Sequence, residues 1–143
     1  MTHIDPPSPR LWTDRVRWFD ERLRKAGDGK PIPVGSQTEA VLTELRRVFA
    51  AGAWVSAVIL AQTAIDSEVS ERVEQAVGDG LYLNTVRFGR DYVWLRERRN
   101  AYLHHEGPLP AITARDLALE QPRLERDARR AVELMADALA GKA

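Results

Sequence analysis

Ten residues near the end of a predicted helix combine the side chains that chemistry on a phosphodiester requires. The segment from Arg98 to Gly107 reads RRNAYLHHEG, and it holds two of the three histidines in the 143-residue chain. Arginine binds phosphate oxygens through paired, charge-assisted hydrogen bonds. Histidine, with an ordinary pKa of about 6.5, both accepts and donates protons near neutral pH. Together these residues predict phosphodiester chemistry without a metal.

The spacing within this segment limits which side chains can meet. Asn100 and His104 are four residues apart, so they would share one face of a helix. Arg99 and His104 are five apart, which separates them by roughly 140° around a regular helix. They could still meet if the helix ends between them, or if the same segment of a second chain faces them across a two-fold axis. A solvated helix end that complements the helix dipole would have a similar composition.

The stretch from Arg99 to His104 resembles the motif of HEPN domains, in which an Arg, often followed directly by an Asn, precedes a His by four to six residues. The sequence FAAGAWVSAVILAQTAIDSEV, from Phe49 to Val69, is similar to the turn and long core helix of that family. The resemblance covers roughly residues 36–140. It implies an all-α bundle that usually forms a homodimer with the motif at the interface.

The resemblance also implies a function. HEPN proteins are metal-independent endoribonucleases, or catalytically inactive relatives that bind RNA, nucleotides or proteins, and many act in prokaryotic antiviral defence or with an antitoxin partner. By this resemblance, Arg99 would stabilise the scissile phosphate, Asn100 would orient the histidine or bind a phosphate oxygen, and His104 would be the acid/base residue. Pairings of Arg98 with His104 or His105, and of Arg99 with His105, also satisfy the motif spacing.

Neighbouring residues leave further alternatives open. HEPN toxins silenced by AMPylation often carry a tyrosine two residues after the motif His, but this chain has Glu106 there. Glu106 could instead tune a histidine or be exposed. Arg90 and Arg96 could extend an RNA-binding surface or be ordinary surface charges. Asp66 and Glu68 lie on the preceding helix, where an acidic residue of HEPN domains often faces the groove. Either could bind the arginine or belong to a solvated helix face.

Composition excludes several other classes of protein. The chain has no cysteine, and 21 basic residues balance 21 acidic ones, so neither disulfides nor binding of nucleic acid by bulk charge is expected. No His/Asp/Glu cluster has the spacing of a metal site, and the loop from Gly27 to Gly35 lacks the pattern of a phosphate-binding loop. We therefore expect neither a metal nor a cofactor.

The hydropathy of the chain predicts a cytoplasmic protein. The apolar run from Ala53 to Ala64 is too short and too mixed to span a membrane. The first ten residues, MTHIDPPSPR, have no apolar core of the kind found in a signal peptide.

Capping and breaking signals predict five or six helices in one compact domain, with an N-terminal helix and loop in residues 1–35 and a bundle of four core helices in residues 36–143. Ser8 should cap the first helix, and the pair Ser36 and Glu39 should form a capping box for the second. The remaining helices are expected from Ala53 to Gly78–Gly80, from Arg90 to His105, after Thr113, and from Pro122 to Leu139, with residues 81–88 undecided.

Apolar residues at helical spacing predict which faces are buried. The four tryptophans are expected mainly in the core or at a dimer contact, with base stacking as the alternative. The predicted stripes comprise Trp12, Val16, Phe19 and Leu23; Val41, Leu42, Leu45, Val48 and Phe49; Trp54, Val58, Ala61, Ile65 and Val69; Tyr92, Leu95, Tyr102 and Leu103; and Leu124, Ala128, Val132, Met135 and Leu139.

Overall fold

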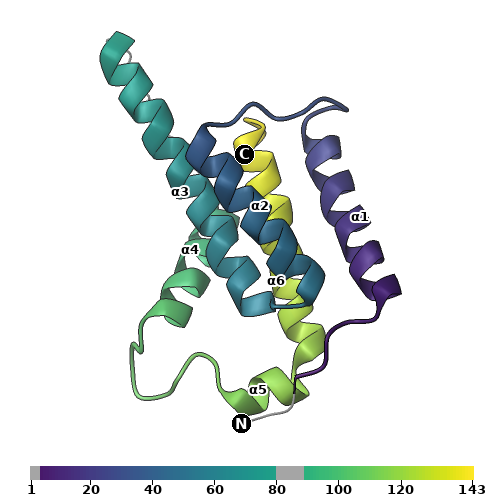
Figure 1. Cartoon of the computed structure of the whole chain (residues 1–143). Helices are drawn as coiled ribbons and strands as arrows, with labels where there is room; N and C mark the ends of the chain where they lie inside the picture. The colour runs from purple at the N-terminus through teal and green to yellow at the C-terminus, as the bar shows by residue number, and fades with distance from the viewer. Residues whose placement is uncertain (1–3, 80–88) are drawn as a thin grey trace.

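The chain folds as an all-α bundle (Figure 1), as its periodicity predicts. The computed structural model describes residues 4–79 and 89–143, so His3 and the undecided segment 81–88 lie outside the described residues. Within those ranges there is no strand, and no helix is long and apolar enough to cross a membrane. The helices are α1 (Pro9–Ala26), α2 (Ser36–Ala51), α3 (Trp54–Asp79), α4 (Arg90–Leu103), α5 (Ala114–Leu119) and α6 (Gln121–Leu139).

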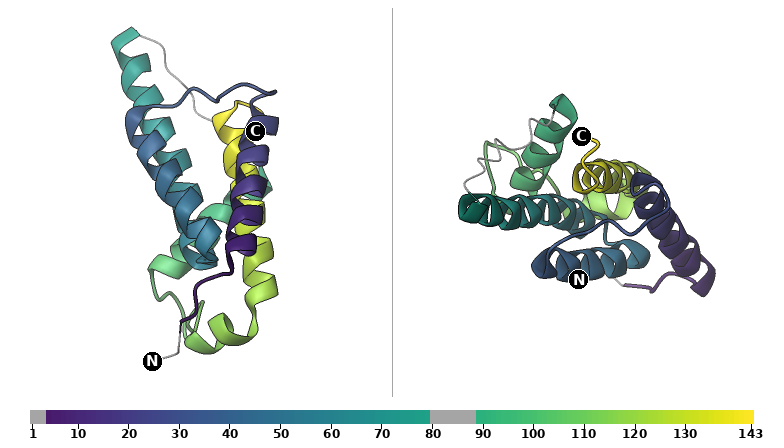
Figure 2. Two further views of the ribbon diagram at one scale, coloured as in Figure 1. Left: turned by 45° about the vertical axis from the view of Figure 1, so that its right-hand side comes forward. Right: turned by 90° about the horizontal axis from the view of Figure 1, so that it is seen from above.

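Helix α3 is the central element of the bundle. It packs against α2, α4 and α6, and the view from above shows α2 and α4 on its two sides (Figure 2). Ala57, Ala61 and Ala64 are completely buried along α3. Because these side chains are small, the neighbouring helices can approach the α3 backbone closely. The predicted stripes of α3 and α6 are buried or packed against the core, which confirms the periodicity.

An aromatic cluster joins α1, α2 and the start of α3. The ring of Phe49, which is completely buried, stacks on Trp18 at a centroid distance of 5.1 Å and meets Trp54 edge-on at 5.3 Å. Such pairs contribute about 0.5–1.5 kcal/mol beyond their burial. Trp18 and Trp54 are therefore packing residues, whereas Trp12 stays 41% exposed although the stripe predicted it to be buried.

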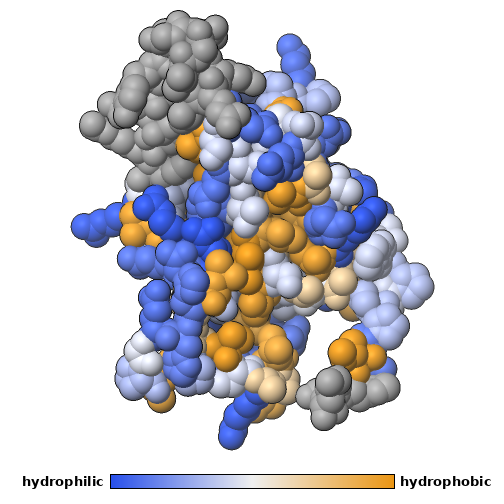
Figure 3. All heavy atoms as spheres, turned by 60° about the vertical axis from the view of Figure 1, so that its left-hand side comes forward, coloured by the Kyte–Doolittle hydropathy of each residue, from blue (hydrophilic) through white to orange (hydrophobic). Residues whose placement is uncertain are grey.

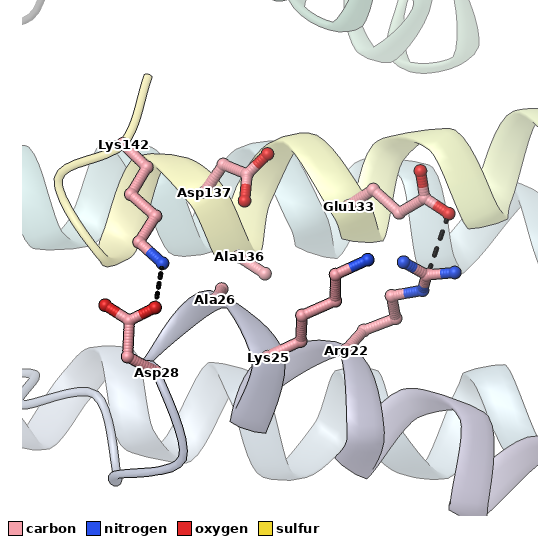
Figure 4. A pocket seen from close by; sticks show the side chains of 8 residues that line it. All are labelled: Arg22, Lys25, Ala26, Asp28, Glu133, Ala136, Asp137 and Lys142. Carbon is pink, nitrogen blue, oxygen red and sulfur yellow. Dashed lines mark hydrogen bonds and ion pairs between the residues drawn. The ribbon is translucent and has the colours of Figure 1, made fainter.

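Helix α1 belongs to the same packing unit as the rest of the chain. Phe19 on α1 is only 1% exposed and joins the main core. Near the end of α1, Arg22 pairs with Glu133 of α6 at 3.6 Å, and Lys142 binds Asp28 at 2.7 Å (Figure 4). Residues 1–35, in their described part, thus pack directly on the bundle formed by residues 36–143.

Local capping signals locate several helix ends correctly. The Ser8 side chain accepts a hydrogen bond from the backbone N–H of Leu11 at 3.2 Å, as expected for an N-cap. Thr113 and Asp116 form a complete capping box at the start of α5. Gly52 ends α2 with φ of 79°, a left-handed conformation that favours glycine.

The predicted capping box of α2 is wrong. Gly35 is the N-cap, Ser36 already lies in the helix, and the Ser36 side chain makes no capping hydrogen bond. Instead, the N–H of Gly35 donates to Glu68 Oε2 at 3.0 Å and the N–H of Gln37 donates to Glu71 Oε1 at 3.2 Å. Two carboxylates from α3 thus stabilise the positive end of α2, which no local signal could reveal.

Helix α4 is shorter than predicted. It ends at Leu103, and His104 is the C-cap residue with extended backbone angles (φ −130°, ψ 133°). Tyr92 and Leu95 are buried as expected, but Leu103 is 51% exposed rather than inward-facing. Leu103 lies about 100° around the helix from Tyr102, so it points away from the buried side. The following residues offer no apolar stripe that would extend the helix against the core.

Tyr92 is a buried phenol of α4 whose ionisation is coupled to folding. Burial, followed by the charges of Asp137 and Asp91, raises the pKa of Tyr92 to about 12. Its hydroxyl donates to the carbonyl of Leu134 at 2.8 Å, which links α4 to α6. In the unfolded chain the same phenol ionises near its usual pKa of about 10.

The free energy of unfolding should therefore fall as the pH rises from about 10 to about 12, because the unfolded state releases the phenol proton before the folded state does. Below that range Tyr92 is protonated in both states and its contribution is fully present. Tyr92→Phe should lower stability by about 1 kcal/mol at neutral pH and reduce the alkaline loss. Urea unfolding of both proteins across this pH range measures the effect, and parallel pH profiles would contradict it.

Candidate functional site

The Arg99 side chain is held between two helices at the last turn of α4. It is 19% exposed and crosses to α3, where Nη1 donates to Asp66 Oδ2 at 2.9 Å. Its Nε donates to the side-chain oxygen of Asn100 at 2.8 Å. The structure therefore brings together two of the predicted site residues, Arg99 and Asn100, and adds Asp66 as the ionic partner that the sequence left open.

A buried glutamine completes this polar network. Gln62, which is 4% exposed, donates from Nε2 to Asp66 Oδ1 at 2.8 Å. Both carboxylate oxygens of Asp66 thus accept a hydrogen bond, one from α3 itself and one from α4. Sequence reasoning did not assign Gln62 to the site. The available signal was a polar pair four residues apart in an otherwise apolar helix.

One edge of the Arg99 guanidinium remains available. Within the described residues, Nη2 makes no hydrogen bond, and no buried side-chain nitrogen or oxygen there lacks a partner. Nη2 must therefore be reachable by solvent. The arrangement fixes the position of the cation through Nε and Nη1 and leaves Nη2 to donate to an external anion such as a phosphate oxygen.

His104, His105 and Glu106 follow the end of α4 and are exposed. The backbone of His104 still donates to the carbonyl of Asn100 at 3.0 Å, and the N–H of Glu106 donates to the carbonyl of His104 at 3.0 Å. Within the described part of the chain, neither imidazole makes a hydrogen bond or ion pair. The helix thus ends between Arg99 and His104, which is one of the two arrangements that the spacing allowed.

Arg98 belongs to a different cluster from Arg99. Its guanidinium lies 6.0 Å from the centre of the Trp94 ring, and Arg130 of α6 lies 4.0 Å from the same ring. Burial raises the pKa of Tyr102, and the positive charge of the neighbouring Arg98 partly offsets this increase. Because consecutive residues differ by about 100° around a helix, the two arginines point to different sides of α4.

The other predicted residues are not joined to the Arg99 network. Arg90, at the start of α4, and Arg96 are both exposed. Glu68 is 7% exposed and serves the N-terminus of α2 while pairing with Arg72 at 3.3 Å, so it does not face Arg99. Among residues 4–79 and 89–143, no group of three His, Cys, Asp or Glu side chains could hold a metal ion.

No protein-family model, curated protein or solved structure matches this chain. The resemblance to HEPN domains therefore depends on the motif that spans the end of α4 and on the order of the helices.

The ion pair between Arg99 and Asp66 should contribute measurably to stability, because Arg99 is largely shielded from solvent. We expect a coupling free energy of about 1 kcal/mol, the upper end of the range for exposed pairs, in a double-mutant cycle of Arg99→Ala and Asp66→Ala, measured by urea unfolding. The exposed pair Arg47 and Glu44 provides a control cycle with a smaller coupling. A coupling of zero for Arg99 and Asp66 would show that this contact does not hold the guanidinium.

Proposed function

We propose that this protein is a metal-independent endoribonuclease of the HEPN type, acting in a prokaryotic defence or toxin–antitoxin context. The observation that carries this proposal is the arginine of the motif. Arg99 is fixed by Asp66 and Asn100, keeps Nη2 accessible, and is followed by an exposed His104 just past the end of α4.

The proposed reaction uses the ribose of the RNA as the nucleophile. His104 accepts the proton of a 2′-hydroxyl, whose oxygen attacks the adjacent 3′-phosphate and displaces the 5′-oxygen of the next nucleotide. A proton returned to that 5′-oxygen completes the cleavage. The products are a 2′,3′-cyclic phosphate and a 5′-hydroxyl. DNA has no 2′-hydroxyl and is not cleaved.

Arg99 would supply the electrostatic part of this mechanism. Negative charge grows on the phosphate oxygens as the 2′-oxygen attacks, and a donor that is already in position stabilises it without reorganisation. Asn100 accepts from Nε and Asp66 accepts from Nη1, so they orient the fork while Nη2 faces the phosphate. Arg90 and Arg96 would bind phosphates further along the strand as exposed cations on the same helix.

A homodimer is part of this proposal because a second copy would bring a second Arg99 and His104 to one substrate. An apolar band runs between hydrophilic surfaces on the side of the molecule where α3 and α4 lie (Figure 3). Val55 and Ile59, one turn apart on α3, are partly exposed and do not belong to the core, and Leu103 on α4 is 51% exposed. Apolar residues left unburied in this way favour contact with another protein surface.

One observation favours a second candidate, a catalytically inactive HEPN-like module that binds RNA, nucleotides or another protein. Two of the three nitrogens of the Arg99 guanidinium are occupied within the chain itself. An arginine held in this way would have a purely structural role, the attachment of α4 to α3. The cleavage experiment below separates the two functions.

Wild-type protein should cleave total tRNA or a labelled single-stranded RNA in the presence of EDTA. The fragments should end in cyclic phosphate, which mass spectrometry identifies. Arg99→Ala and His104→Ala should each reduce the rate by about 100-fold or more, since each removes a group that acts on the reacting atoms. A matched DNA strand should remain intact.

Arg98→Ala and His105→Ala are the matched controls for this experiment. Activity that survives in both variants would assign the catalytic roles to Arg99 and His104. Loss of activity in either variant would instead assign the role of the arginine to Arg98 or that of the histidine to His105. A folded dimer that cleaves no RNA, in EDTA or in magnesium, would contradict the ribonuclease and favour the binding module.

Ile59→Glu should convert the dimer to a monomer, because a charge buried in an apolar interface without a partner is strongly unfavourable. Light scattering coupled to size-exclusion chromatography measures the mass, and circular dichroism checks the fold. Leu119→Glu, at a position on α5 that is 64% exposed, is the control and should leave the dimer intact. A monomeric wild-type protein, or a dimer unaffected by Ile59→Glu, would refute this interface.

A further inference from the structure

A pocket lies between α1, the following loop and α2, far along the chain from the α4 motif. Its volume is about 390 Å³, within the range of about 300–1,000 Å³ that is usual for small-molecule sites. Leu23 of α1, Leu42 of α2 and Ile32 of the loop line it, together with Pro31. We refer to this cavity as the α1–α2 pocket. Its apolar lining suits a hydrocarbon group.

The charged residues at this pocket are unevenly paired. Arg24 and Lys30 both line it, and neither forms an ion pair with any residue in the described part of the chain. The carboxylate that lines it, Asp20, is already occupied, since Arg46 donates to its two oxygens through Nε and Nη2, each at 2.8 Å. The pocket therefore combines an apolar interior with two cations that pair with no carboxylate among the described residues.

The turn before the pocket fixes the position of Lys30. Asp28 and Gly29 adopt positive φ angles of 54° and 85°, and the N–H of Lys30 donates to the carbonyl of Gly27 at 3.0 Å. A Cβ atom on Gly27 would lie 2.2 Å from the Lys30 carbonyl oxygen, so the chain can close this tightly because residue 27 is glycine. The turn therefore holds the backbone of Lys30 in a defined conformation beside the pocket.

A neighbouring pocket differs from the α1–α2 pocket in the balance of its charges. The cavity between α1 and α6 is lined by three cations, Arg22, Lys25 and Lys142, and by three carboxylates, Asp28, Glu133 and Asp137 (Figure 4). Two of these cations are paired with two of the carboxylates. That cavity selects neither sign of ligand charge, whereas the α1–α2 pocket favours an anion.

We propose that the α1–α2 pocket binds a small amphipathic anion, a free molecule with one hydrocarbon chain and a terminal carboxylate. The chain would contact Leu23, Ile32 and Leu42, and the carboxylate would accept hydrogen bonds from Arg24 and Lys30. The apolar contact supplies most of the binding, and the two cations select the charge. This site is separate from the proposed ribonuclease site and does not depend on it.

Titration of the ¹⁵N-labelled full chain with octanoate, followed by amide chemical shifts, tests the proposal. Shifts should concentrate on Leu23, Gly29, Ile32 and Leu42. The double variant Arg24→Gln/Lys30→Gln should bind octanoate about tenfold more weakly, which corresponds to the loss of two exposed charge-assisted contacts. Arg10→Gln, at the opposite end of α1, removes one exposed arginine outside the pocket and should bind like the wild type.

Two further probes separate the parts of the interaction. Octanol has the same chain without the charge and should bind less tightly than octanoate, and acetate has the charge without the chain and should cause no comparable shifts. The proposal is overturned if octanoate leaves these amides unchanged or shifts a different region. It is equally overturned if octanol binds as tightly as octanoate, or if the double variant keeps the wild-type affinity.

Discussion

The bundle depends on the ability of α3 to be buried on several sides at once. It packs against α2, α4 and α6, and a helix in that position needs small or apolar side chains around most of its circumference. Ala57, Ala61 and Ala64 meet this requirement where the contacts are closest. Two acidic residues of α3 bind partners on neighbouring helices. Glu68 caps α2, and Asp66 holds Arg99.

Helix α4 is attached to this framework by fewer buried side chains than α6 and by several polar contacts. Tyr92 and Leu95 are its buried side chains, whereas α6 buries eight. The ion pair of Arg99 with Asp66 and the hydrogen bond from Tyr92 to the Leu134 carbonyl supply additional attachment. The candidate catalytic arginine therefore also positions its own helix. Loss of activity in an Arg99 variant has catalytic meaning only if α4 remains in place.

The sequence predicts those features of the fold that local patterns determine. The stripe of α6 and the caps at Ser8 and Thr113 follow from side chains a few residues apart, and the structure confirms them. The cap of α2 could not be predicted, since its carboxylates come from residues about thirty positions further along the chain. The contact of Arg99 with Asp66, 33 residues apart, was only one of two open alternatives for the same reason.

The end of α4 separates the histidines of the motif from its arginines. His104 is the C-cap residue with extended backbone angles, and the N–H of Glu106 donates to the carbonyl of His104 at 3.0 Å, so the chain turns at His105. The helical spacing of about 100° per residue therefore no longer fixes the direction of either imidazole. The two arginines, in contrast, are fixed on different sides of α4, because Arg98 lies against Trp94 and Arg99 binds Asp66. The choice of arginine, which the sequence leaves ambiguous, is thus a choice between two sides of one helix.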